Sequence, residues 1–505
     1  MLLSAFDRRD FENRTALIFL DRHLSYGEIA AEGWRVAAGL QLLGISKGDR
    51  VAIHMRNGPQ LLASIIGCWR IGAIAVPIRP WQAPAMIVAW CGYLGVVCLL
   101  VDELLVEKVR PHVSELTTCR AVVSTGSVPR TDGIQPWSAL FDNDGGHERI
   151  AADEREPAII VHTSGTTARA KAVGQSMRGL RARASAQLTH LPFGPDDVVG
   201  VFSDCSHSFG LHVMTTPAFA VGATVLMMPE FKPAAILRAM TKHGATVTGG
   251  APGYLLGLLE AARRDREFNA PKLRLVISSS DKLPESFYGE WREVFDAPLI
   301  EGYGMTEACG NITFNRPGDV GEGSVGRPLP GVQIRIVGPD GRDVPDGMVG
   351  ELWCTGDFLF AQYWNDPDAT RRAMVDGWFR TGDQAVRDHH GRYRIVGRTG
   401  FMIKRGGIFV SPFEVEAALA QHPAIAECMA TGALSEQWGQ EVEAFLVLRR
   451  TVSAADLHAH AAQALGEPSR PVRFWSVPEI PKTPAGKVAR GELGELRASA
   501  RPLAM

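Results

Sequence analysis

Helix-like and strand-like segments alternate along most of the chain, and this alternation limits the fold more than any other feature. From Leu24 to Pro80 an amphipathic segment is followed by KGDRVAIHM, an apolar helical segment and IAVPI. From Glu156 to Ile300 the alternation recurs, with strand patterns at AIIVHT, ATVLMM, ATVTGG and LRLVISS. Strands separated by helices are typical of parallel, doubly wound sheets. We therefore predict one large α/β unit.

The pattern changes twice in the remainder of the chain. Between Gly326 and Gly397 short strands and Asp-Gly turns predominate, which indicates a small β-rich module. After Arg398 the periodicity changes again. Ser411 and Pro412 then open an amphipathic helix, and the last hundred or so residues are typical of a compact α+β domain.

These changes predict the domain boundaries. A chain of 505 residues is too long for one ordinary hydrophobic core. We predict a core over residues 1–397, which includes the β-rich module at about 326–397. A small α+β domain follows over residues 401–505, with a hinge near 398–400.

Charge and cysteine usage exclude several classes of function. The 53 basic and 55 acidic residues are scattered, so the basic stripe of a nucleic-acid-binding protein is missing. None of the eight cysteines has the CxxC spacing of a zinc site or a redox pair. The charged N-terminus is unlike a secretion signal. The most apolar segment, Cys91 to Val101, is too short to span a bilayer and is interpreted as a buried strand. We expect a cytoplasmic protein without nucleic-acid or membrane partners.

A loop rich in small hydroxyl residues follows the strand pattern at AIIVHT. Its backbone N–H groups and hydroxyls can turn toward phosphate oxygens, with Lys171 as a point charge. The loop lacks the GxxxxGK[ST] pattern of a Walker loop. A polar strand-to-helix turn would have the same composition, so this stretch alone leaves both interpretations open. The candidate phosphate-binding residues before the lysine are Thr163, Ser164, Gly165, Thr166 and Thr167.

This loop resembles the TSGTTGxPKG signature of the adenylate-forming superfamily, which includes acyl-CoA and aryl-CoA synthetases, luciferases and adenylation domains of nonribosomal peptide synthetases. Further matches follow in the order of that family. They are Tyr303-Gly-Met-Thr-Glu307, Gly350-Glu-Leu352, Trp378-Phe-Arg-Thr-Gly-Asp383, Gly397-Arg398 and Pro481-Lys-Thr-Pro-Ala-Gly-Lys487. The resemblance spans nearly the whole chain and implies an ATP-dependent enzyme that forms an acyl-adenylate.

The loop departs from the signature at three positions. Ala168, Ala170 and Ala172 stand where the family has Gly, Pro and Gly. A positive φ at Ala168 would cost about 1 kcal/mol and stiffen the loop. We therefore expect slow or specialised catalysis, with an ATP-binding pseudoenzyme as the alternative.

The resemblance assigns roles to the residues around the nucleotide. Glu307 is expected to bind Mg²⁺, because magnesium takes hard oxygen ligands beside substrate phosphates. Thr306 would bond a phosphate oxygen, and Tyr303 with Gly304 would contact adenine. Asp383 resembles the family's acceptor for the ribose hydroxyls. Arg398 resembles the family's residue that contacts the ribose and the phosphates.

The resemblance also implies that the C-terminal domain is mobile. In the family it rotates between two half-reactions, which requires a hinge. Lys487 is expected to bridge carboxylate and phosphate oxygens during adenylation. Lys404 and Gly407 lie on the opposite face, Gly407 at the thiol channel. Gly400, followed by Phe401, takes the hinge position, where the family usually has Asp or Lys, and implies weaker conformational control.

Three stretches are expected to line the acid-binding slot. Their residues are His207, Ser208, Phe209, Ser278, Ser279, Ser280, Gly302, Met305 and Cys309. The stretch from His207 to Phe209 lacks the Asp that pairs with an α-ammonium group in amino-acid-activating members. A core histidine is the plain alternative for His207. Ser279 and Ser280 replace a wall that is often glycine, so we favour a compact aryl or short substituted acid.

The acyl acceptor is open at this level. Coenzyme A is expected, because no carrier domain follows Lys487, but the phosphopantetheine of a separate carrier protein fits equally. A third alternative is another oxyacid, such as nitrite, as in the diazotase branch that resembles this family. A homodimer is compatible with the sequence.

Overall fold

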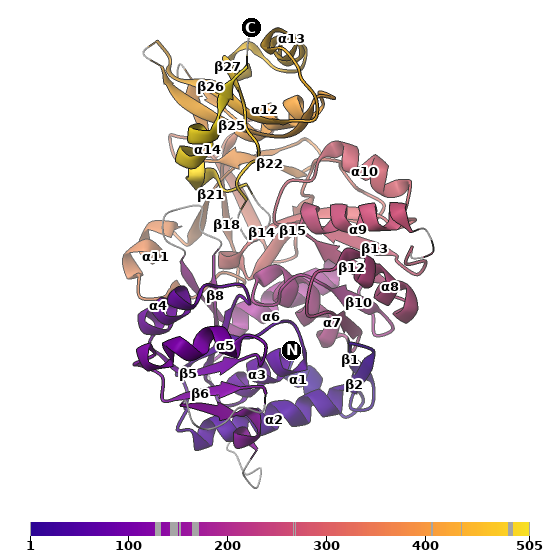
Figure 1. Ribbon diagram of the computed structural model, residues 1–505, viewed down its shortest axis with the longest axis vertical. Coiled ribbons are helices and arrows are strands. Elements are labelled where there is room, and N and C mark those ends of the chain that lie inside the picture. Colours follow the sequence, from indigo (N-terminus) through magenta and orange to yellow (C-terminus); the bar gives the residue numbers. More distant parts are fainter. Residues whose placement is uncertain are drawn as a thin grey trace. The chain divides into compact units, whose positions relative to one another are not determined.

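The computed structural model describes residues 2–126, 133–141, 150, 153–163, 171–265, 267, 269–405, 408–435, 437–482 and 488–503. These residues form two compact units (Figure 1). The first comprises the chain up to 163, 171–333 and 355–374, and the second 334–354 and the chain from 375 on. In the described part of the chain, no helix combines the length and apolarity needed to cross a membrane.

Two sheets form the framework of the first unit. One has the strand order β16-β15-β14-β13-β12-β10-β11-β1-β2, and the other β19-β9-β8-β4-β3-β5-β6-β7. Their inner strands are parallel, while β2, β9, β15, β16 and β19 pair antiparallel. The bounds in the first sheet are β1 Thr15–Phe19, β2 Arg22–Ser25, β10 Val198–Val201, β11 Thr224–Met227, β12 Val247–Gly250, β13 Leu275–Ser278, β14 Leu299–Met305, β15 Gly310–Phe314 and β16 Arg327–Pro328. Those in the second are β3 Arg50–His54, β4 Ile74–Ile78, β5 Val96–Val101, β6 Ala121–Ser124, β7 Ile134–Pro136, β8 Pro157–His162, β9 Ala172–Ser176 and β19 Gln362–Tyr363. The predicted α/β class is confirmed.

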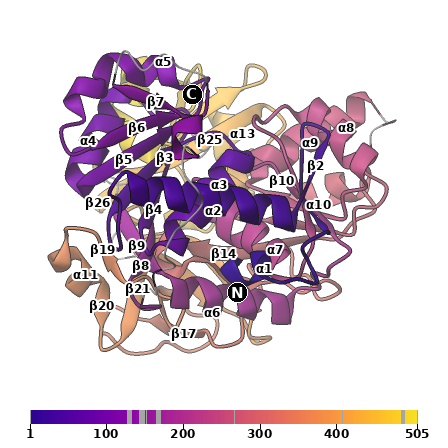
Figure 2. The ribbon, with the colours of Figure 1, turned by 90° about the horizontal axis from the view of Figure 1, so that it is seen from below.

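The longest helix of this unit, α2, begins at a capping motif. Ser25 and Glu28 form a capping box at the start of α2, with the two reciprocal hydrogen bonds 3.1 and 2.7 Å long. The bounds are α1 Leu2–Phe6, α2 Tyr26–Leu42, α3 Pro59–Arg70, α4 Pro84–Leu94, α5 Val106–Val109, α6 Met177–His190, α7 Thr216–Ala220, α8 Pro233–His243, α9 Pro252–Arg264, α10 Glu285–Arg292 and α11 Pro367–Ala373. Helices α2 and α3 lie side by side (Figure 2). A Cβ on Gly33 of α2 would lie 2.6 Å from Ile66 of α3, so glycine permits their close contact.

Side-chain alternation along the strands builds two apolar layers in the first unit. On β13, Val276 faces a cluster with α8, α9 and α10, while Ile277 faces a cluster that includes α2 and α3. Val225 and Leu226 of β11 divide between the same two clusters. Burial on both faces explains why these strands have almost continuous apolar sequences.

The prediction of a buried strand from Cys91 to Val101 is wrong in its first half. Residues up to Leu94 complete α4, and the strand β5 begins at Val96. Gly95 separates them with a left-handed φ of 62°, which ends the helix. Cys91 and Leu94 of the helix are buried, as is all of β5, and an apolar run of this length does not distinguish helix from strand.

The second unit contains two further sheets. One has the order β17-β18-β21-β20 with β22 on β21, and the other β24-β23-β26-β27-β28 with β25 on β26. Ser411 caps α12 through Glu414 N at 3.2 Å, as its Ser-Pro start predicts. The strand bounds are β17 Gln333–Val337, β18 Gly350–Thr355, β20 Met374–Val375, β21 Trp378–Arg387, β22 Tyr393–Arg398, β23 Ile403–Arg405, β24 Ile408–Val410, β25 Ile425–Ser435, β26 Gly439–Leu448, β27 Arg473–Ser476 and β28 Arg501–Pro502. The helices are α12 Pro412–Ala420, α13 Ala454–Ala464 and α14 Leu493–Ser499.

The β-rich stretch over 326–397 is divided between the units. Strands β16 and β19 and helix α11 belong to the first unit, and the other strands lie mainly in the second. The hinge near 398–400 stays a prediction.

Candidate active site

The candidate phosphate loop connects β8 to β9, and the residues at its two ends are hydrogen-bonded to each other. Val161 pairs with Val173 and His162 with Ala172 in an antiparallel ladder. Beyond it, Thr163 N donates to Lys171 O at 3.0 Å, and Lys171 N donates to Thr163 Oγ1 at 3.0 Å. Ser164, Gly165, Thr166 and Thr167, like Ala168 and Ala170, lie outside the described residues.

Lys171 and Glu307 are linked through one tyrosine. Strand β19 pairs with β9, with Tyr363 opposite Val173, so its side chain lies near the end of the loop. The Lys171 ammonium is 4.2 Å from the centroid of the Tyr363 ring. Tyr363 Oη donates to Glu307 Oε1 at 2.8 Å. Sequence reasoning missed Tyr363, whose one signal is its place in an aromatic stretch after the Gly350-Glu-Leu motif.

The Thr306–Glu307 turn is fixed from two further directions. Gln175 Nε2 of β9 donates to Thr306 O at 2.6 Å, and Phe360 N donates to Glu307 O at 2.7 Å. Thr306 is buried, whereas Glu307 is partly exposed. The turn therefore presents a carboxylate to solvent from a rigid backbone.

Strand β14 carries Tyr303 to this turn by changing partners along its length. It pairs parallel with β13 at Ser278–Glu301 and then antiparallel with β15, where Gly304 faces Asn311. A Cβ on Gly304 would lie 2.1 Å from Gly310 O. Only glycine allows this approach of the two strands.

The predicted acid-binding residues converge on the ends of β12, β13 and β15. Phe209 begins a short π-helix, Phe209–Thr215, a type of segment frequent at functional sites. A Cβ on Gly249 of β12 would lie 3.1 Å from the Phe209 ring. Ser279 Oγ donates to Asn311 Oδ1 at 3.0 Å and ties β13 to β15.

The remaining predicted acid-binding residues lie just before the π-helix, at the end of β13, on β14 and after the Glu307 turn. His207 Nδ1 accepts from Phe209 N at 3.3 Å. Ser208 and Ser278 are buried, and Ser280 has a left-handed φ of 78°. Cys309 follows the Glu307 turn, and burial raises the pKa of its thiol to about 12. Gly302 and Met305 lie on β14.

The second unit presents the predicted ribose contacts as a pair. Asp383 of β21 lies opposite Arg398 of β22, with Arg398 Nε 3.5 Å from Asp383 Oδ1. Thr381 Oγ1 accepts from Asp383 N at 3.0 Å, which fixes the backbone beside the carboxylate. Strands β21 and β22 thus present a carboxylate and a guanidinium side by side.

The other functional residues predicted in this unit are placed only by their backbone surroundings. Lys404 lies on β23 opposite Phe409 of β24. Gly400 is exposed, with open space where a Cβ would lie. Gly407 and Lys487 lie outside the described residues. The segment that carries Lys487 starts and ends at a β-bridge between Lys482 and Val488.

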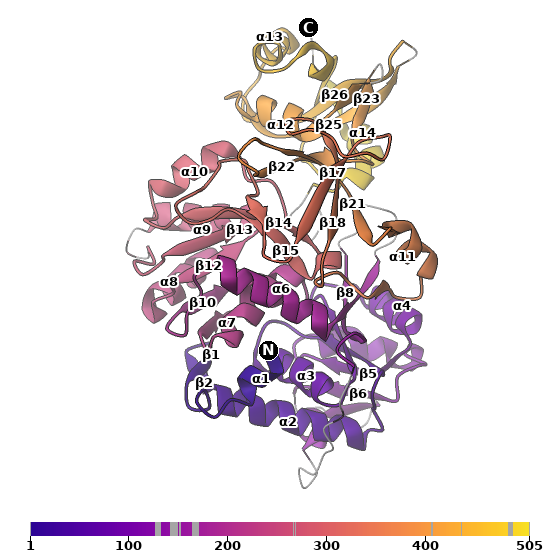
Figure 3. The ribbon, with the colours of Figure 1, turned by 180° about the vertical axis from the view of Figure 1, so that it is seen from behind.

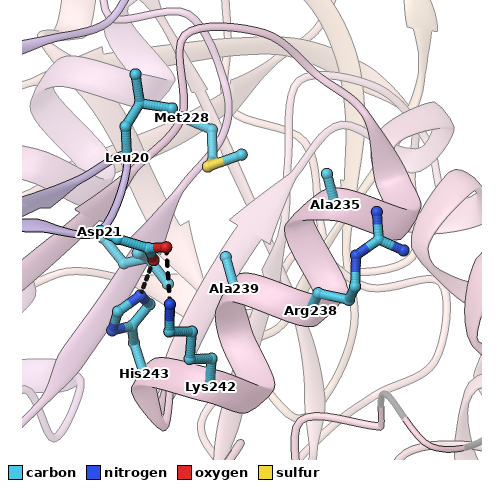
Figure 4. Close-up of a pocket in the computed structure, with 9 residues that line it drawn as sticks. Leu20, Asp21, Met228, Ala235, Arg238, Ala239, Lys242 and His243 are labelled. Carbon is cyan, nitrogen blue, oxygen red and sulfur yellow. Dashed lines mark hydrogen bonds and ion pairs between the residues drawn. The ribbon is translucent and has the colours of Figure 1, made fainter.

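A separate cavity of about 210 Å³ lies at the β1–β2 turn, against β11 and α8 (Figure 4). The Asp21 carboxylate accepts from Lys242 Nζ at 2.7 Å and from His243 Nε2 at 2.8 Å. These two hydrogen bonds lower the pKa of Asp21. Because the Asp21 carboxylate is paired within the wall and no predicted site residue lines the cavity, we assign it no catalytic role.

Comparison with known proteins identifies the family. The model of the AMP-binding enzyme family matches residues 6–364, and that of the AMP-binding enzyme C-terminal domain matches residues 414–487. The chain belongs to the AMP-binding enzyme family. The predicted resemblance is confirmed, and as a family member the chain is an AMP-forming acid–thiol ligase.

Relatives of this AMP-binding enzyme match along almost its whole length. The indoleacetate–CoA ligase of Aromatoleum aromaticum is 31% identical and the match covers 96% of this chain and 95% of the relative. The sulfoacetate–CoA ligase of Cupriavidus necator is 31% identical, and the match covers 93% of this chain and 92% of the relative. An anthranilate CoA ligase in complex with anthranoyl-AMP has a TM-score of 0.90 at 25% identity. The match covers 99% of this chain and 97% of that structure's chain. The o-succinylbenzoate coenzyme A synthetase of Bacillus subtilis, in complex with ATP and magnesium ion, has a TM-score of 0.84 at 25% identity over 98% of each chain.

Proposed function

We propose that this AMP-binding enzyme uses ATP to convert a compact aryl or short substituted carboxylic acid into its coenzyme A thioester. The observation that carries the proposal is the link from Lys171 through Tyr363 to Glu307 at the base of the phosphate loop. It places a cation over the face of the Tyr363 ring and a carboxylate at the hydroxyl of the same side chain. The full-length similarity to CoA ligases supports coenzyme A as the acceptor.

The first step joins two anions and therefore requires cations. An oxygen of the acid's carboxylate forms a bond to the α-phosphorus of ATP, and the bond from that phosphorus to the bridging oxygen of pyrophosphate breaks. Lys171 would neutralise charge on the leaving pyrophosphate, and Lys487 charge between carboxylate and α-phosphate. Asp383 and Arg398 would hold the ribose. The products are the acyl-adenylate and pyrophosphate.

Glu307 is suited to hold Mg²⁺. Its oxygens are hard ligands, it is partly exposed, and Tyr363 orients one of its oxygens. The described residues contain no group of three or more His, Cys, Asp or Glu side chains placed to bind a metal, so the other ligands would be phosphate oxygens and water. Bound there, Mg²⁺ supplies charge neutralisation on the phosphates.

In the second step the thiol of coenzyme A attacks the acyl carbonyl. The C–S bond forms, the bond between the carbonyl carbon and the AMP oxygen breaks, and the thiol proton passes to solvent. Lys404 and Gly407 would face the thiol after rotation about the hinge at Gly400. AMP leaves and the thioester is released.

The limited size of the acid is supported by the end of β13. Ser279 is buried and bonded to Asn311, so this wall consists of side chains where bare glycine would leave space. Phe209 packs against Gly249 on the adjacent strand. Bulky chains would have to displace these contacts.

The test is a substrate panel with the purified chain, ATP and Mg²⁺. Benzoates, arylacetates, short substituted acids, decanoate, an α-amino acid and nitrite are each supplied with and without coenzyme A. The proposal predicts pyrophosphate release with compact acids, and AMP with an equal amount of thioester when coenzyme A is present. If thioester forms only on an added carrier protein, the acceptor is that carrier protein and not coenzyme A. Pyrophosphate release with nitrite but with none of the carboxylic acids would overturn the proposal, and so would no release with any compound of the panel.

A further inference from the structure

One buried arginine on α6 has an open hydrogen-bonding edge. Arg183 is 2% exposed, and its Nη1 donates to Gln187 Oε1. Its Nε and Nη2 have no hydrogen-bond partner among the described residues, and no described carboxylate pairs with it. Nε and Nη2 form the edge of a guanidinium that binds a carboxylate through two parallel hydrogen bonds.

The open edge of Arg183 points at the strand that follows the Glu307 turn. A Cβ on Gly310 of β15 would lie 2.9 Å from Arg183 Nε and 3.1 Å from Nη2. Gly310 has a φ of 122°, so both its conformation and this approach require glycine. Helix α6 lies beside β15 (Figure 3). The guanidinium is fixed there, because Gln187 in turn donates to Val213 O at 2.9 Å.

Two neighbouring side chains extend this set of donors. Asn311 is 3% exposed. Its Oδ1 accepts from Ser279, but its Nδ2 has no partner among the described residues. His212, 3% exposed, has no partner at either ring nitrogen within the described chain. Burial, together with the charge of Arg183, lowers the pKa of His212 to about 3, so its imidazole is neutral and donates one hydrogen bond. We name Arg183, His212 and Asn311 the donor cluster.

The donor cluster adjoins the predicted acid-binding residues. Asn311 is bonded to Ser279, and a Cβ on Gly302 would lie 2.4 Å from Asn311 Nδ2. His212 lies on the same π-helix as Phe209. The cluster is therefore continuous with the residues that the sequence predicts for the acid-binding slot.

Burial of an unpaired cation and of unsatisfied donors lowers the stability of the fold unless an anion binds to them. The unpaired groups of Arg183 and Asn311 can only donate, so the occupant must be rich in acceptors. Burial lowers the pKa of Arg183 to about 9, which still leaves the guanidinium charged at neutral pH. A carboxylate matches the planar edge and the charge.

We propose that the acid substrate is a dicarboxylic acid, whose second carboxylate binds the donor cluster while the first is adenylated. This inference rests on the proposed function and specifies the substrate class of the same site. The second carboxylate stays intact through both half-reactions. The product is the thioester of one carboxylate, with the other free.

The experiment compares diacids with neutral isosteres in which a methyl ketone replaces the second carboxylate. The pairs are succinate with 4-oxopentanoate, glutarate with 5-oxohexanoate, and phthalate or isophthalate with the matching acetylbenzoate. The ratio of kcat/KM within a pair is measured for thioester formation. For at least one length, the wild-type ratio is expected to be about 10²-fold in favour of the diacid, as for a charged hydrogen-bonded group at a built site.

Three variants separate binding from folding. Arg183→Met is expected to bring the ratio near one and to leave the ketone rate within about threefold, since it removes the charge and little volume. Arg183→Lys should give an intermediate ratio. Arg178→Met is the matched control on the same helix, because Arg178 is exposed and paired with Asp357 at 2.8 Å; its ratio should equal that of the wild type.

The outcomes distinguish the two claims. If the wild type converts the ketone acids at least as well as the diacids at every length, or if Arg183→Met keeps the diacid preference, the dicarboxylate assignment is overturned while the proposed function stands. If no acid of either kind gives pyrophosphate or thioester, the proposed function itself fails. Should Arg183→Met be insoluble, the wild-type ratios and Arg183→Lys decide.

Discussion

The hydroxyl of Tyr363 donates a 2.8 Å hydrogen bond to Oε1 of Glu307. The ring of Tyr363 also faces the Lys171 ammonium, so one side chain orients an anion and a cation that are both expected to act on the nucleotide. We expect Tyr363 to be a positioning residue for adenylation.

Tyr363→Phe separates these two contacts, because it keeps the ring and removes the hydrogen bond. A hydrogen bond to a charged group contributes about 1.5–3 kcal/mol, and the partial exposure of Glu307 favours the lower value. We predict a roughly tenfold loss of pyrophosphate release at limiting Mg²⁺. A titration of the rate against Mg²⁺ measures it.

The control is Tyr26→Phe, which removes a buried hydrogen bond of 2.7 Å to Ala223 O. It should lower the melting temperature and leave the Mg²⁺ dependence unchanged. Equal Mg²⁺ curves for Tyr363→Phe and the wild type would contradict the positioning role.

Glu307→Gln removes the proposed metal ligand's charge with little change in volume. We expect adenylate formation to fall while the fold is retained, because the side chain is partly exposed and the turn is held by Gln175 and Phe360. The rate at limiting Mg²⁺ and the melting curve are measured together. Unchanged activity at limiting Mg²⁺ would show that another residue binds the metal.

Ser279→Gly and Ser280→Gly test the size of the acid slot. Each removes a hydroxymethyl group, so acids bulkier than the best wild-type substrate should gain in relative kcat/KM. Ser280→Gly should leave the free energy of unfolding nearly unchanged, because relief of the left-handed φ and the added chain entropy oppose each other at about 1 kcal/mol each. If both variants keep the acid profile of the wild type, neither serine lines the slot.

Much of the fold follows from local patterns in the sequence. Ser411 caps the helix that its Ser-Pro start predicts, and the amphipathic segment predicted after Leu24 is a helix that begins at the Ser25–Glu28 capping box. The division of the parallel strands into two sheets was not predictable, because β1 pairs with β11, some 200 residues later, and periodicity contains no such pairing information.

The site was predictable where motifs mark it and not where burial decides. Helix α6 contains Arg178, Arg181 and Arg183, and only the last faces the core with Leu180 and Ala184. Helical spacing places Arg183 on the same face as Leu180 and Ala184, but it does not show that this face packs in the core or that the guanidinium lacks a partner there. Tyr363 reaches Glu307 through the pairing of β19 with β9, a tertiary contact that neighbouring residues do not specify.

Lys487→Ala should affect one half-reaction only. Its ammonium is expected to stabilise charge while carboxylate and α-phosphate approach, so adenylation should slow by at least about 10²–10³-fold. Conversion of supplied acyl-adenylate to thioester should survive, with little change in stability. The two rates are measured on one preparation. Equal losses in both would mean a structural role for Lys487 or a domain that does not rotate.

The most direct test of acyl-adenylate formation follows the oxygen atoms of the acid. A substrate acid labelled with ¹⁸O in both oxygens of the reacting carboxylate is converted with ATP, Mg²⁺ and coenzyme A, and the AMP and pyrophosphate are analysed by mass spectrometry. Attack of the carboxylate on the α-phosphorus predicts AMP that carries one ¹⁸O atom and pyrophosphate that carries none. Unlabelled AMP, with thioester formed, would contradict the adenylate mechanism.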